Sequence, residues 1–385
     1  MNDRVALLTN MPAPYRLPFF KELNRYCDLL VVFDGYIEPN RQWKLGEEEL
    51  GIRYTFAQGL CIPYQRKRLD IGASGERYLR IQYDIIPTLY AFKPSVVVSA
   101  EMGPRTLQAA VYCEVTNTPL IIWWEGTQHT EGWVRKKKSY LRKFLVRRAR
   151  RFWSNGYAST ALLLDYGAAP DAIDEGMISA DTNLLVQETR NILALRAQLR
   201  SELRLNGVVF LFVGRYVEAK GIKEYLEALN LLYGVGLREW SVVFVGSGPL
   251  ESVLRSWQVE HPDIPTLISD FVQPQELPKF YAIADVLVMP TLEDNWSLVA
   301  LEAAVAGVPQ LFSVYNGCTS DLLWDERVGC VVDPLKVGEL ASALEDYVHG
   351  PLPRLPDELV QWFAGHYGPE QVAARARASL QKALG

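Results

Sequence analysis

Two apolar runs that each end at a glycine constrain the fold of this chain more than any other feature. The first run, Val208–Val213, stops at Gly214, and the second, Val242–Val245, stops at Gly246. Runs of this length without alternating polar residues are typical of strands buried on both faces. A helical pattern follows each turn. The repeat of strand, turn and helix predicts an α/β fold, although the second turn alone could serve only to let strand and helix pack closely.

The N-terminal half alternates apolar runs with helical patterns in the same way, which predicts a parallel sheet with helices on both faces. The expected strands are Val5–Leu8, Leu29–Phe33, Ser95–Ser99, Leu120–Trp124 and Arg151–Ser154. The expected helices are Leu17–Tyr26, Gly75–Ala91, Arg105–Val115 and Lys136–Ala149.

A polar, helical stretch separates the two halves. We place a hinge there, at residues 188–206, because a new series of strand, turn and helix begins at Val208. Residues 1–187 are then expected to form one domain and residues 207–365 a second, since 385 residues are long for a single core. Residues 366–385 carry one more helical pattern, Pro369–Leu384.

Charge and cysteine content narrow the class of protein. The net charge of −5 does not favour nucleic acid as a partner. The five cysteines are odd in number and scattered without metal-ligand spacing, so we expect reduced thiols in a cytoplasmic protein. The apolar run Val5–Leu8 is too short for a secretory signal, and no apolar stretch approaches the length that spans a bilayer.

Two acidic residues, Asp294 and Glu302, flank the point where a loop is expected to become a helix. The run Ile283–Met289 predicts a buried strand before the loop, and Leu298–Ala306 predicts the helix. A helix start at a strand end favours anions, and a carboxylate accepts hydrogen bonds from two vicinal hydroxyls. The pair therefore suits the sugars on either side of a bound diphosphate. The alternative is that Asp294 caps the helix and Glu302 is solvated.

Two basic residues, Arg215 and Lys220, follow the first apolar run. They are expected at the carboxyl end of a strand, the edge at which open α/β sheets bind ligands. Fixed cations there can neutralise a departing diphosphate. No aspartate has another aspartate two residues away, so the carboxylate pair with which many transferases hold a metal ion is missing. The alternative for Arg215 is a salt bridge at the strand end.

In this order, the motifs resemble the pattern of the retaining GT-B glycosyltransferases of family 4, the glycosyl transferases group 1. The matching residues are Gly214, Arg215, Lys220, Gly221, Val245, Gly246, Gly248, Pro249, Phe271, Val272, Glu276, Leu277, Pro278, Tyr281, Ala284, Asp285, Val286, Pro290, Asp294 and Glu302. The resemblance covers Val208 to Asp333 well. Before it, Thr9–Arg16 is similar to the opening of a bacterial polysaccharide subgroup. One departure is Asp294, where the family has glutamate, and Glu293 beside it is a candidate substitute.

The resemblance implies a fold and an activity. The fold is GT-B: an acceptor-side Rossmann-like domain, a nucleotide-sugar-binding Rossmann-like domain, a cleft between them, and a C-terminal helix that crosses back to the first domain. The activity is retaining transfer of a sugar from a nucleotide-diphospho-sugar to a lipid-linked or polysaccharide acceptor, in bacterial polysaccharide or glycolipid synthesis. No cofactor or metal is expected. The alternatives are a nucleotide-sugar epimerase or hydrolase without a separate acceptor, and a non-catalytic membrane-associated partner.

The resemblance also implies a role for each matched residue. Arg215 and Lys220 contact the donor diphosphate, Glu302 holds the ribose, and Asp294 binds hydroxyls of the donor sugar. Backbone N–H groups at the helix start face the phosphate nearest the sugar, and backbone near Val272 meets the base. The donor-binding set is Asp294, Asn295, Trp296, Ser297, Leu298, Glu302 and Val272.

Glu125 follows the expected strand Leu120–Trp124, where the family usually has a histidine. A carboxylate there can contact the donor sugar or accept the acceptor's proton. The alternative is a strand-end acid bonded to the next loop. His129 is expected to be a bystander, and the loop Asn10–Arg16 is expected to line the acceptor side. The predicted catalytic residues are Arg215, Lys220 and Glu125.

Residues 135–151 form a basic segment. Its ten cations are Arg135, Lys136, Lys137, Lys138, Arg142, Lys143, Arg147, Arg148, Arg150 and Arg151. On a helix, one face would carry Leu141, Phe144, Leu145, Ala149 and Phe152. Such a helix suits an anionic membrane, which would place the protein peripherally on the inner face of the cell membrane. The alternative is a packed helix with a solvated outer face, and nucleic acid is not expected because no recognition module accompanies the segment.

Overall fold

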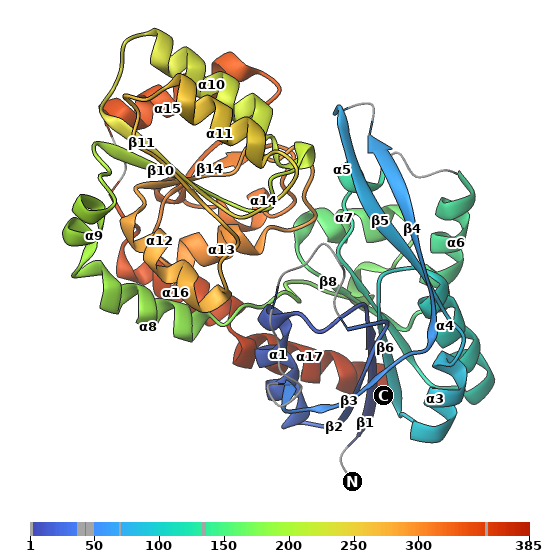
Figure 1. Ribbon diagram of the computed structural model, residues 1–385. Coiled ribbons are helices and arrows are strands. Elements are labelled where there is room, and N and C mark those ends of the chain that lie inside the picture. Colours follow the sequence, from blue (N-terminus) through green and yellow to red (C-terminus); the bar gives the residue numbers. More distant parts are fainter. Residues whose placement is uncertain (1–2, 37–42, 44–49, 69–70, 133–135, 351–352) are drawn as a thin grey trace. The chain divides into compact units, whose positions relative to one another are not determined.

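The chain forms two compact units, each built on its own parallel sheet (Figure 1). The computed structural model describes residues 3–36, 43, 50–68, 71–132, 136–350 and 353–385. Unit 1 consists of Met1–Arg66, Glu76–Asp181 and His366–Gly385. Unit 2 consists of Lys67–Gly75 and Thr182–Gly365.

The sheet of unit 1 is 7-stranded and parallel, in the order β3-β2-β1-β6-β7-β8-β9. Its strands are β1 (Arg4–Thr9), β2 (Asp28–Phe33), β3 (Arg53–Phe56), β6 (Val96–Ala100), β7 (Leu120–Trp124), β8 (Arg151–Ser154) and β9 (Ile173–Asp174). The strand order reverses at β1, which pairs with β2 on one side and β6 on the other. Open α/β sheets bind ligands beside such a reversal, at the carboxyl ends of the strands.

Helices cover both faces of this sheet, as the alternating pattern predicts (Figure 1). They are α1 (Leu17–Asn24), α3 (Ile85–Phe92), α4 (Pro104–Thr116), α5 (Gln128–Glu131), α6 (Lys136–Val146), α7 (Tyr157–Asp165) and α17 (Pro369–Leu384). The C-terminal helix α17 packs on α1, and Trp153 of β8 donates a hydrogen bond to Ser379 of α17 at 2.8 Å. The implied return of the last helix to the first domain is confirmed.

A two-stranded ribbon, β4 (Gly59–Arg68) with β5 (Ala73–Gln82), stands outside the large sheets. The helix expected over Gly75–Ala91 is therefore wrong in its first half, and α3 begins only at Ile85. The reason lies in the side-chain period. From Leu79 onward apolar and polar residues alternate, which is the period of a strand, and the segment pairs with the equally alternating run that starts at Leu60.

The sheet of unit 2 is 6-stranded and parallel, in the order β12-β11-β10-β13-β14-β15. Its strands are β10 (Val208–Val213), β11 (Trp240–Val245), β12 (Thr266–Ser269), β13 (Val286–Val288), β14 (Gln310–Ser313) and β15 (Gly329–Val332). The bounds expected for β10 are confirmed. The strand expected over Ile283–Met289 is shorter, because Ile283 still belongs to the helix before it.

The helices of the C-terminal half are α8 (Thr182–Leu193), α9 (Arg196–Glu202), α10 (Ile222–Gly234), α11 (Glu251–Glu260), α12 (Leu277–Ile283), α13 (Leu298–Val305), α14 (Thr319–Leu322), α15 (Val337–His349) and α16 (Asp357–Tyr367). Three of them, α10, α11 and α15, bury a second core of aromatic and aliphatic side chains on this sheet, and the other helices of this half lie outside that core. Residues 188–206, where we expect a hinge, carry the end of α8 and all of α9. Across the described residues, no helix is long and apolar enough to cross a bilayer.

Candidate functional site

Two loops of unit 2 meet where the neighbouring strands β10 and β13 end, and they carry most of the predicted donor residues. Residues 214–221 follow β10, and residues 290–297 lie between β13 and α13. The Ala219 carbonyl joins the loops. It accepts hydrogen bonds from the N–H groups of Leu292 (3.0 Å) and Glu293 (3.2 Å) and from the Thr291 hydroxyl (3.1 Å). The two loops therefore behave as one rigid element at the ligand edge of the sheet.

Gly221 permits this close approach. Its φ of +67° lies in the left-handed region, and a Cβ there would lie 1.8 Å from the Pro290 carbonyl oxygen. A larger residue would force the loops apart. Because Gly221 is also the residue at which α10 begins, it places the preceding residue, Lys220, at the junction of the two loops.

Lys220 and Asp294 form an ion pair across this junction. Their Nζ and Oδ2 atoms lie 2.5 Å apart, and both side chains are largely buried. The structure thus brings together the predicted diphosphate cation and the predicted sugar-binding acid, which are 74 positions apart in sequence. Arg215 lies in the first loop and is partly buried. The pair with Asp294 stabilises the largely buried Lys220, since an unpaired charge in this position is costly.

The glycine turn after β11 supports the first loop. The Tyr216 N–H donates a hydrogen bond to the Ser247 carbonyl at 2.8 Å, and the Tyr216 carbonyl accepts one from the Leu250 N–H at 3.0 Å. A Cβ at Gly246 would lie 1.9 Å from the Gly214 carbonyl oxygen. The turn therefore packs closely against the first loop and holds in place the segment that carries Arg215.

The helix α13 begins at Leu298, with Ser297 as its N-cap residue. The alternative that Asp294 caps the helix is therefore wrong, since Asp294 lies three residues before the cap. The buried Trp296 side chain fixes this turn, because its indole N–H donates to Asp321 at 2.9 Å. The first N–H groups of a helix have no carbonyl partner within it, so the start of α13 retains donors that suit a phosphate.

Glu302 lies on α13 and accepts a hydrogen bond from the Tyr281 hydroxyl of α12 at 2.7 Å. Tyr281 is fully buried and Glu302 is partly buried, so the alternative of a solvated glutamate is wrong. Burial raises the pKa of Glu302 to about 7, and the bond from Tyr281 opposes that rise. Near neutral pH this carboxyl group is thus divided between its protonated and ionised forms.

Arg354 ties α12 and α13 together at their C-terminal ends. Its guanidinium donates to the carbonyl oxygens of Tyr281 and Ala284, both at 3.2 Å, and to that of Ala306. The sequence analysis did not single out Arg354, and nothing in the local pattern marks it. Its partners are 48 to 73 positions away, so only the fold reveals the contact.

Three further residues of the donor region can be placed. Glu293, the candidate substitute for Asp294, pairs with the buried Arg68 at 3.5 Å. Asp294, by contrast, pairs with Lys220, the predicted diphosphate cation, which favours Asp294 as the acid of the motif. Asn295 is partly buried beside Asp294, and Val272 is partly buried in the loop between β12 and α12.

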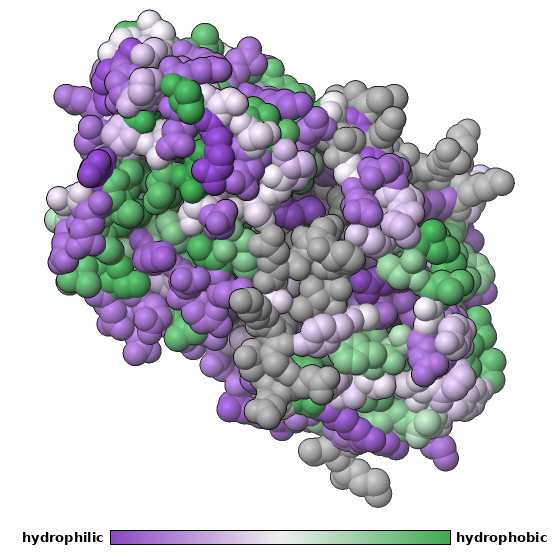
Figure 2. Space-filling view, viewed as in Figure 1, coloured by the Kyte–Doolittle hydropathy of each residue, from purple (hydrophilic) through white to green (hydrophobic). Residues whose placement is uncertain are grey.

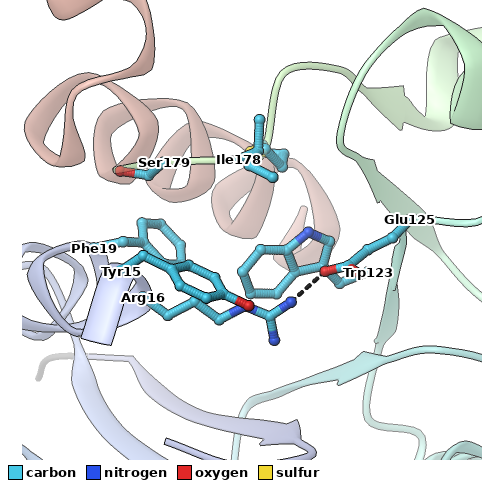
Figure 3. A pocket seen from close by; sticks show the side chains of 8 residues that line it. Tyr15, Arg16, Phe19, Trp123, Glu125, Ile178 and Ser179 are labelled. Carbon is cyan, nitrogen blue, oxygen red and sulfur yellow. Dashed lines mark hydrogen bonds and ion pairs between the residues drawn. The ribbon is translucent and has the colours of Figure 1, made fainter. Parts of the chain in front are cut away.

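In unit 1, a small pocket lies where β1 and β7 end (Figure 3). Arg16 and Glu125 point toward one another in it and form an ion pair. Arg16 also donates to the Thr9 hydroxyl at 2.8 Å, and its guanidinium lies 4.8 Å from the centre of a Trp123 ring. The lining residues are Tyr15, Arg16, Phe19, Trp123, Glu125, Met177, Ile178 and Ser179.

This pocket joins two segments that the sequence analysis treated separately. The loop Asn10–Arg16 supplies Tyr15 and Arg16, and the end of β7 supplies Glu125. Arg16 belongs to the loop that was expected to line the acceptor side, but its pair with Glu125 was not predicted, because the two residues are 109 positions apart. His129 lies on α5 and is not among the residues that line the pocket.

The basic segment packs differently from the membrane-facing helix that we considered. Leu145 and Phe152 are buried in the core of unit 1, with Leu141 and Ala149 packed against it, so the prediction of a lipid-facing apolar side is wrong for these residues. Arg142 is buried too. It pairs with Glu131, donates a hydrogen bond to the Tyr166 hydroxyl at 3.1 Å and lies 4.9 Å from a Trp124 ring centre. Arg135 lies outside the described residues.

Residues 196–361 match the protein family described as glycosyl transferases group 1. Over these residues the chain is a member of that family. The matched segment contains both donor loops together with Tyr281, Glu302 and Arg354, so the family domain is the part of the chain that holds the geometry described above. Among the described residues, no group of three or more His, Cys, Asp or Glu side chains is placed to hold a metal ion, and metal independence stays a prediction.

Group 1 relatives are distant from this chain. A 2-deoxystreptamine glucosyltransferase of Streptomyces kanamyceticus is 26% identical over 231 residues, which are 59% of this chain and 59% of that protein. A sulfoquinovosyl transferase of Arabidopsis thaliana is 24% identical over 320 residues, 79% of this chain and 58% of that protein. The matches thus span less than two thirds of the length of these curated relatives.

A solved structure is similar to this chain in fold. The Anabaena protein Alr3699/HepE in complex with UDP has a TM-score of 0.73 to this chain at 14% sequence identity. The match covers 98% of this chain and 99% of that one. The implied GT-B fold, with two parallel Rossmann-like sheets and a C-terminal helix packed on the N-terminal unit, is confirmed.

Proposed function

We propose that this protein is a retaining, metal-independent glycosyltransferase that uses a nucleotide-diphospho-sugar. The observation that carries the proposal is the Lys220–Asp294 pair, held by two joined loops at the ligand edge of a parallel sheet. A leaving diphosphate needs fixed positive charge, and Lys220 with Arg215 provides it. Asp294 then binds hydroxyls of the donor sugar, and Glu302 binds those of the ribose.

The start of α13 and the loop before α12 complete the proposed donor site. Backbone N–H groups of Trp296, Ser297 and Leu298 face the phosphate nearest the sugar. Backbone near Val272 meets the base. We propose uridine as that base, because the similar Anabaena protein was solved with UDP and with UDP-glucose.

The proposed acceptor is a lipid-linked or polysaccharide glycan. Relatives include a sulfoquinovosyl transferase and a putative teichuronic acid biosynthesis glycosyltransferase, whose names concern a sulfosugar and a polymer. Glu125 of unit 1 contacts the donor sugar or accepts the acceptor's proton. In this proposal the protein works in the cytoplasm, and the exposed cations within residues 135–151 bring it to the anionic inner face of the cell membrane.

A thermal-shift screen of nucleoside diphosphates and nucleotide sugars tests the donor site. A ligand that binds the folded state at 100 times its Kd adds about 2.7 kcal/mol of apparent stability. We expect UDP to raise the Tm of the wild type and to act much more weakly on Lys220→Ala. If none of the nucleotides raises the Tm, the proposal is wrong.

Incubation of each nucleotide sugar without acceptor separates transfer from the alternative activity. A nucleotide-sugar epimerase or hydrolase would convert the donor alone, into an epimer or into free sugar and nucleoside diphosphate. We expect turnover to require a glycan acceptor. Full-rate conversion of the donor in its absence would favour the alternative.

A further inference from the structure

The ribbon of β4 and β5 carries a line of large apolar side chains on one face. The Tyr83 N–H donates to the Gln58 carbonyl at 3.0 Å, which sets the pairing of the strands. In that register Leu60 lies beside Ile81, and Ile62 lies beside Leu79. The side chains that share this face, exposed by 39% to 66%, are Leu60, Ile62, Tyr64, Leu79, Ile81 and Tyr83.

The opposite face of the ribbon is the attached one. Arg80 of β5 donates to the Asn10 carbonyl at 3.1 Å, and Gln82 is buried. Gln108 of α4 donates to the Gln82 carbonyl at 2.6 Å. In the described part of the chain, β4 and β5 pair only with each other. The apolar face therefore points outward. It carries two cross-strand pairs of aliphatic side chains, with a tyrosine at either end.

Helices α4 and α6 extend this surface. Three exposed residues, Leu107, Val111 and Val115, follow one another at helical spacing on α4. The exposed side of α6 holds two aromatics, Tyr140 and Phe144, and one cation, Lys143, and the turn after α6 adds the exposed cations Arg147 and Arg148. Arg148 pairs with Glu114 of α4 at 3.9 Å, which joins the two helices. Figure 2 shows hydrophobic residues gathered over this side of unit 1.

We propose that the outer face of the ribbon, with α4 and the exposed side of α6, docks on an anionic lipid bilayer. Aliphatic residues flanked by tyrosines suit the boundary between acyl chains and headgroups. Beside them lie the cations of α6 and of the turn that follows it, and no acid occurs between Gly132 and Leu164. Glu114 of α4 pairs with one of these cations, Arg148. This inference adds a membrane to the proposed function, in which the acceptor is lipid-linked. It rests on the proposed function only for the reason why the protein would bind a membrane. The docking surface consists of exposed residues and does not include the side of α6 that is buried in the core of unit 1.

Charge favours lipid over a second copy of this chain. A two-fold contact presents the same surface twice, so it would bring the α6 cations toward their own copies. Anionic headgroups instead neutralise them, and each cation near such a surface adds about 1 kcal/mol, or roughly fivefold in partitioning. Headgroup charge is screened by salt, whereas the apolar contact is not.

Sedimentation of the full chain with vesicles tests the proposal. We expect the wild type to sediment with vesicles of phosphatidylglycerol and phosphatidylcholine in equal parts, and hardly with phosphatidylcholine alone. The variant Ile62→Ser with Leu79→Ser should lose most of this binding at every salt concentration. The variant Lys143→Glu with Arg147→Glu should lose it chiefly at low salt. Both variants alter exposed side chains, so their Tm should stay near that of the wild type.

Matched controls lie in unit 2. Val235→Ser with Val259→Ser removes two valines that are more exposed than Ile62 and Leu79, and Lys223→Glu with Lys336→Glu reverses two exposed lysines. Both controls should sediment like the wild type. Unchanged sedimentation of the ribbon variant overturns the proposal. The proposal is also overturned if the wild type is a dimer, the ribbon variant is a monomer and neither protein binds vesicles. A protein that binds UDP but no vesicles refutes docking alone, and the reverse result refutes the transferase proposal alone.

Discussion

The hydroxyl of Tyr281 donates a hydrogen bond to Glu302 over 2.7 Å, and the two residues belong to different helices. One carboxylate oxygen of Glu302 is thereby fixed, while a carboxylate has a second oxygen that can accept ribose hydroxyls. Arg354 holds the ends of both helices, so the donor and the acceptor of this bond cannot drift apart. The arrangement preorganises Glu302 for the proposed contact with the nucleotide.

The first prediction concerns ribose binding. Glu302→Gln should weaken UDP binding by roughly 10- to 100-fold, because a charge-assisted hydrogen bond is worth about 1.5–3 kcal/mol. The 2′,3′-dideoxy analogue of UDP lacks the hydroxyls, so its affinity should be equal in wild type and variant. Calorimetry measures both.

Tyr281→Phe tests the support of Glu302 in the same assay. It should weaken UDP binding less than Glu302→Gln does and leave the dideoxy analogue unaffected. Tyr225→Phe is the matched control, since Tyr225 is also fully buried in unit 2 and its hydroxyl has no hydrogen-bond partner in the described structure. Equal losses for UDP and its dideoxy analogue would show that Glu302 does not hold the ribose.

The second prediction follows from the pKa of Glu302, which burial raises from 4.5 to about 7. Because the folded state holds this proton more tightly than the unfolded state, the group's contribution to stability is complete below about pH 4.5. It is lost as the pH rises through about 7. Glu302→Gln cannot titrate. The Tm of the variant should therefore rise relative to wild type between about pH 5 and about pH 8. A constant Tm difference across that range would contradict the assignment.

The third prediction concerns the leaving group. Lys220→Ala and Arg215→Ala should each lower turnover by roughly 100- to 1000-fold, because each removes a fixed positive charge from the developing diphosphate. Lys223→Ala is the control, since this exposed lysine lies three residues further on and pairs with Glu218 at 2.8 Å. Circular dichroism and Tm report on folding. Turnover within a few fold of wild type in both variants would remove the leaving-group role.

The fourth prediction is that transfer survives excess EDTA. The reason is that side chains supply the positive charge and the sequence lacks a carboxylate pair for a divalent ion. Initial rates with and without the chelator should agree. Loss of activity in EDTA with recovery on adding manganese or magnesium would contradict it.

Local pattern predicted several elements of both units well. The strand β10 and the helix α17 have the expected bounds, because each is a long, consistent period in the sequence. The order of motifs also placed Lys220 and Asp294 in one site. It did not predict that they pair, since that contact depends on how the two loops are joined through Ala219.

Contacts that are distant in sequence account for what the pattern missed. The ribbon depends on pairing between β4 and β5, and a window over residues 75–91 alone does not contain that contact. A helical wheel correctly groups Leu145 with its apolar neighbours but cannot say that they meet a sheet. The raised pKa of Glu302 is likewise a property of burial, which a sequence motif does not contain.

The last prediction concerns the Arg16–Glu125 pair of unit 1. Because Arg16 is held by Thr9 and lies over Trp123, it keeps the Glu125 carboxylate in one place. If Glu125 acts on the donor sugar or the acceptor's proton, Glu125→Gln should lower kcat by about 100-fold or more with little change in the KM for donor. Arg16→Gln should lower kcat less.

The double variant separates a catalytic pair from a structural one. If Arg16 works only by positioning Glu125, Arg16→Gln added to Glu125→Gln should cost no further activity, since residues that act together are not additive. A strand-end acid with a structural role gives another result. Both single variants would then lower the Tm by similar amounts, and kcat per folded molecule would stay near that of the wild type. Steady-state kinetics and thermal unfolding of the three variants therefore decide whether Glu125 takes part in the chemistry.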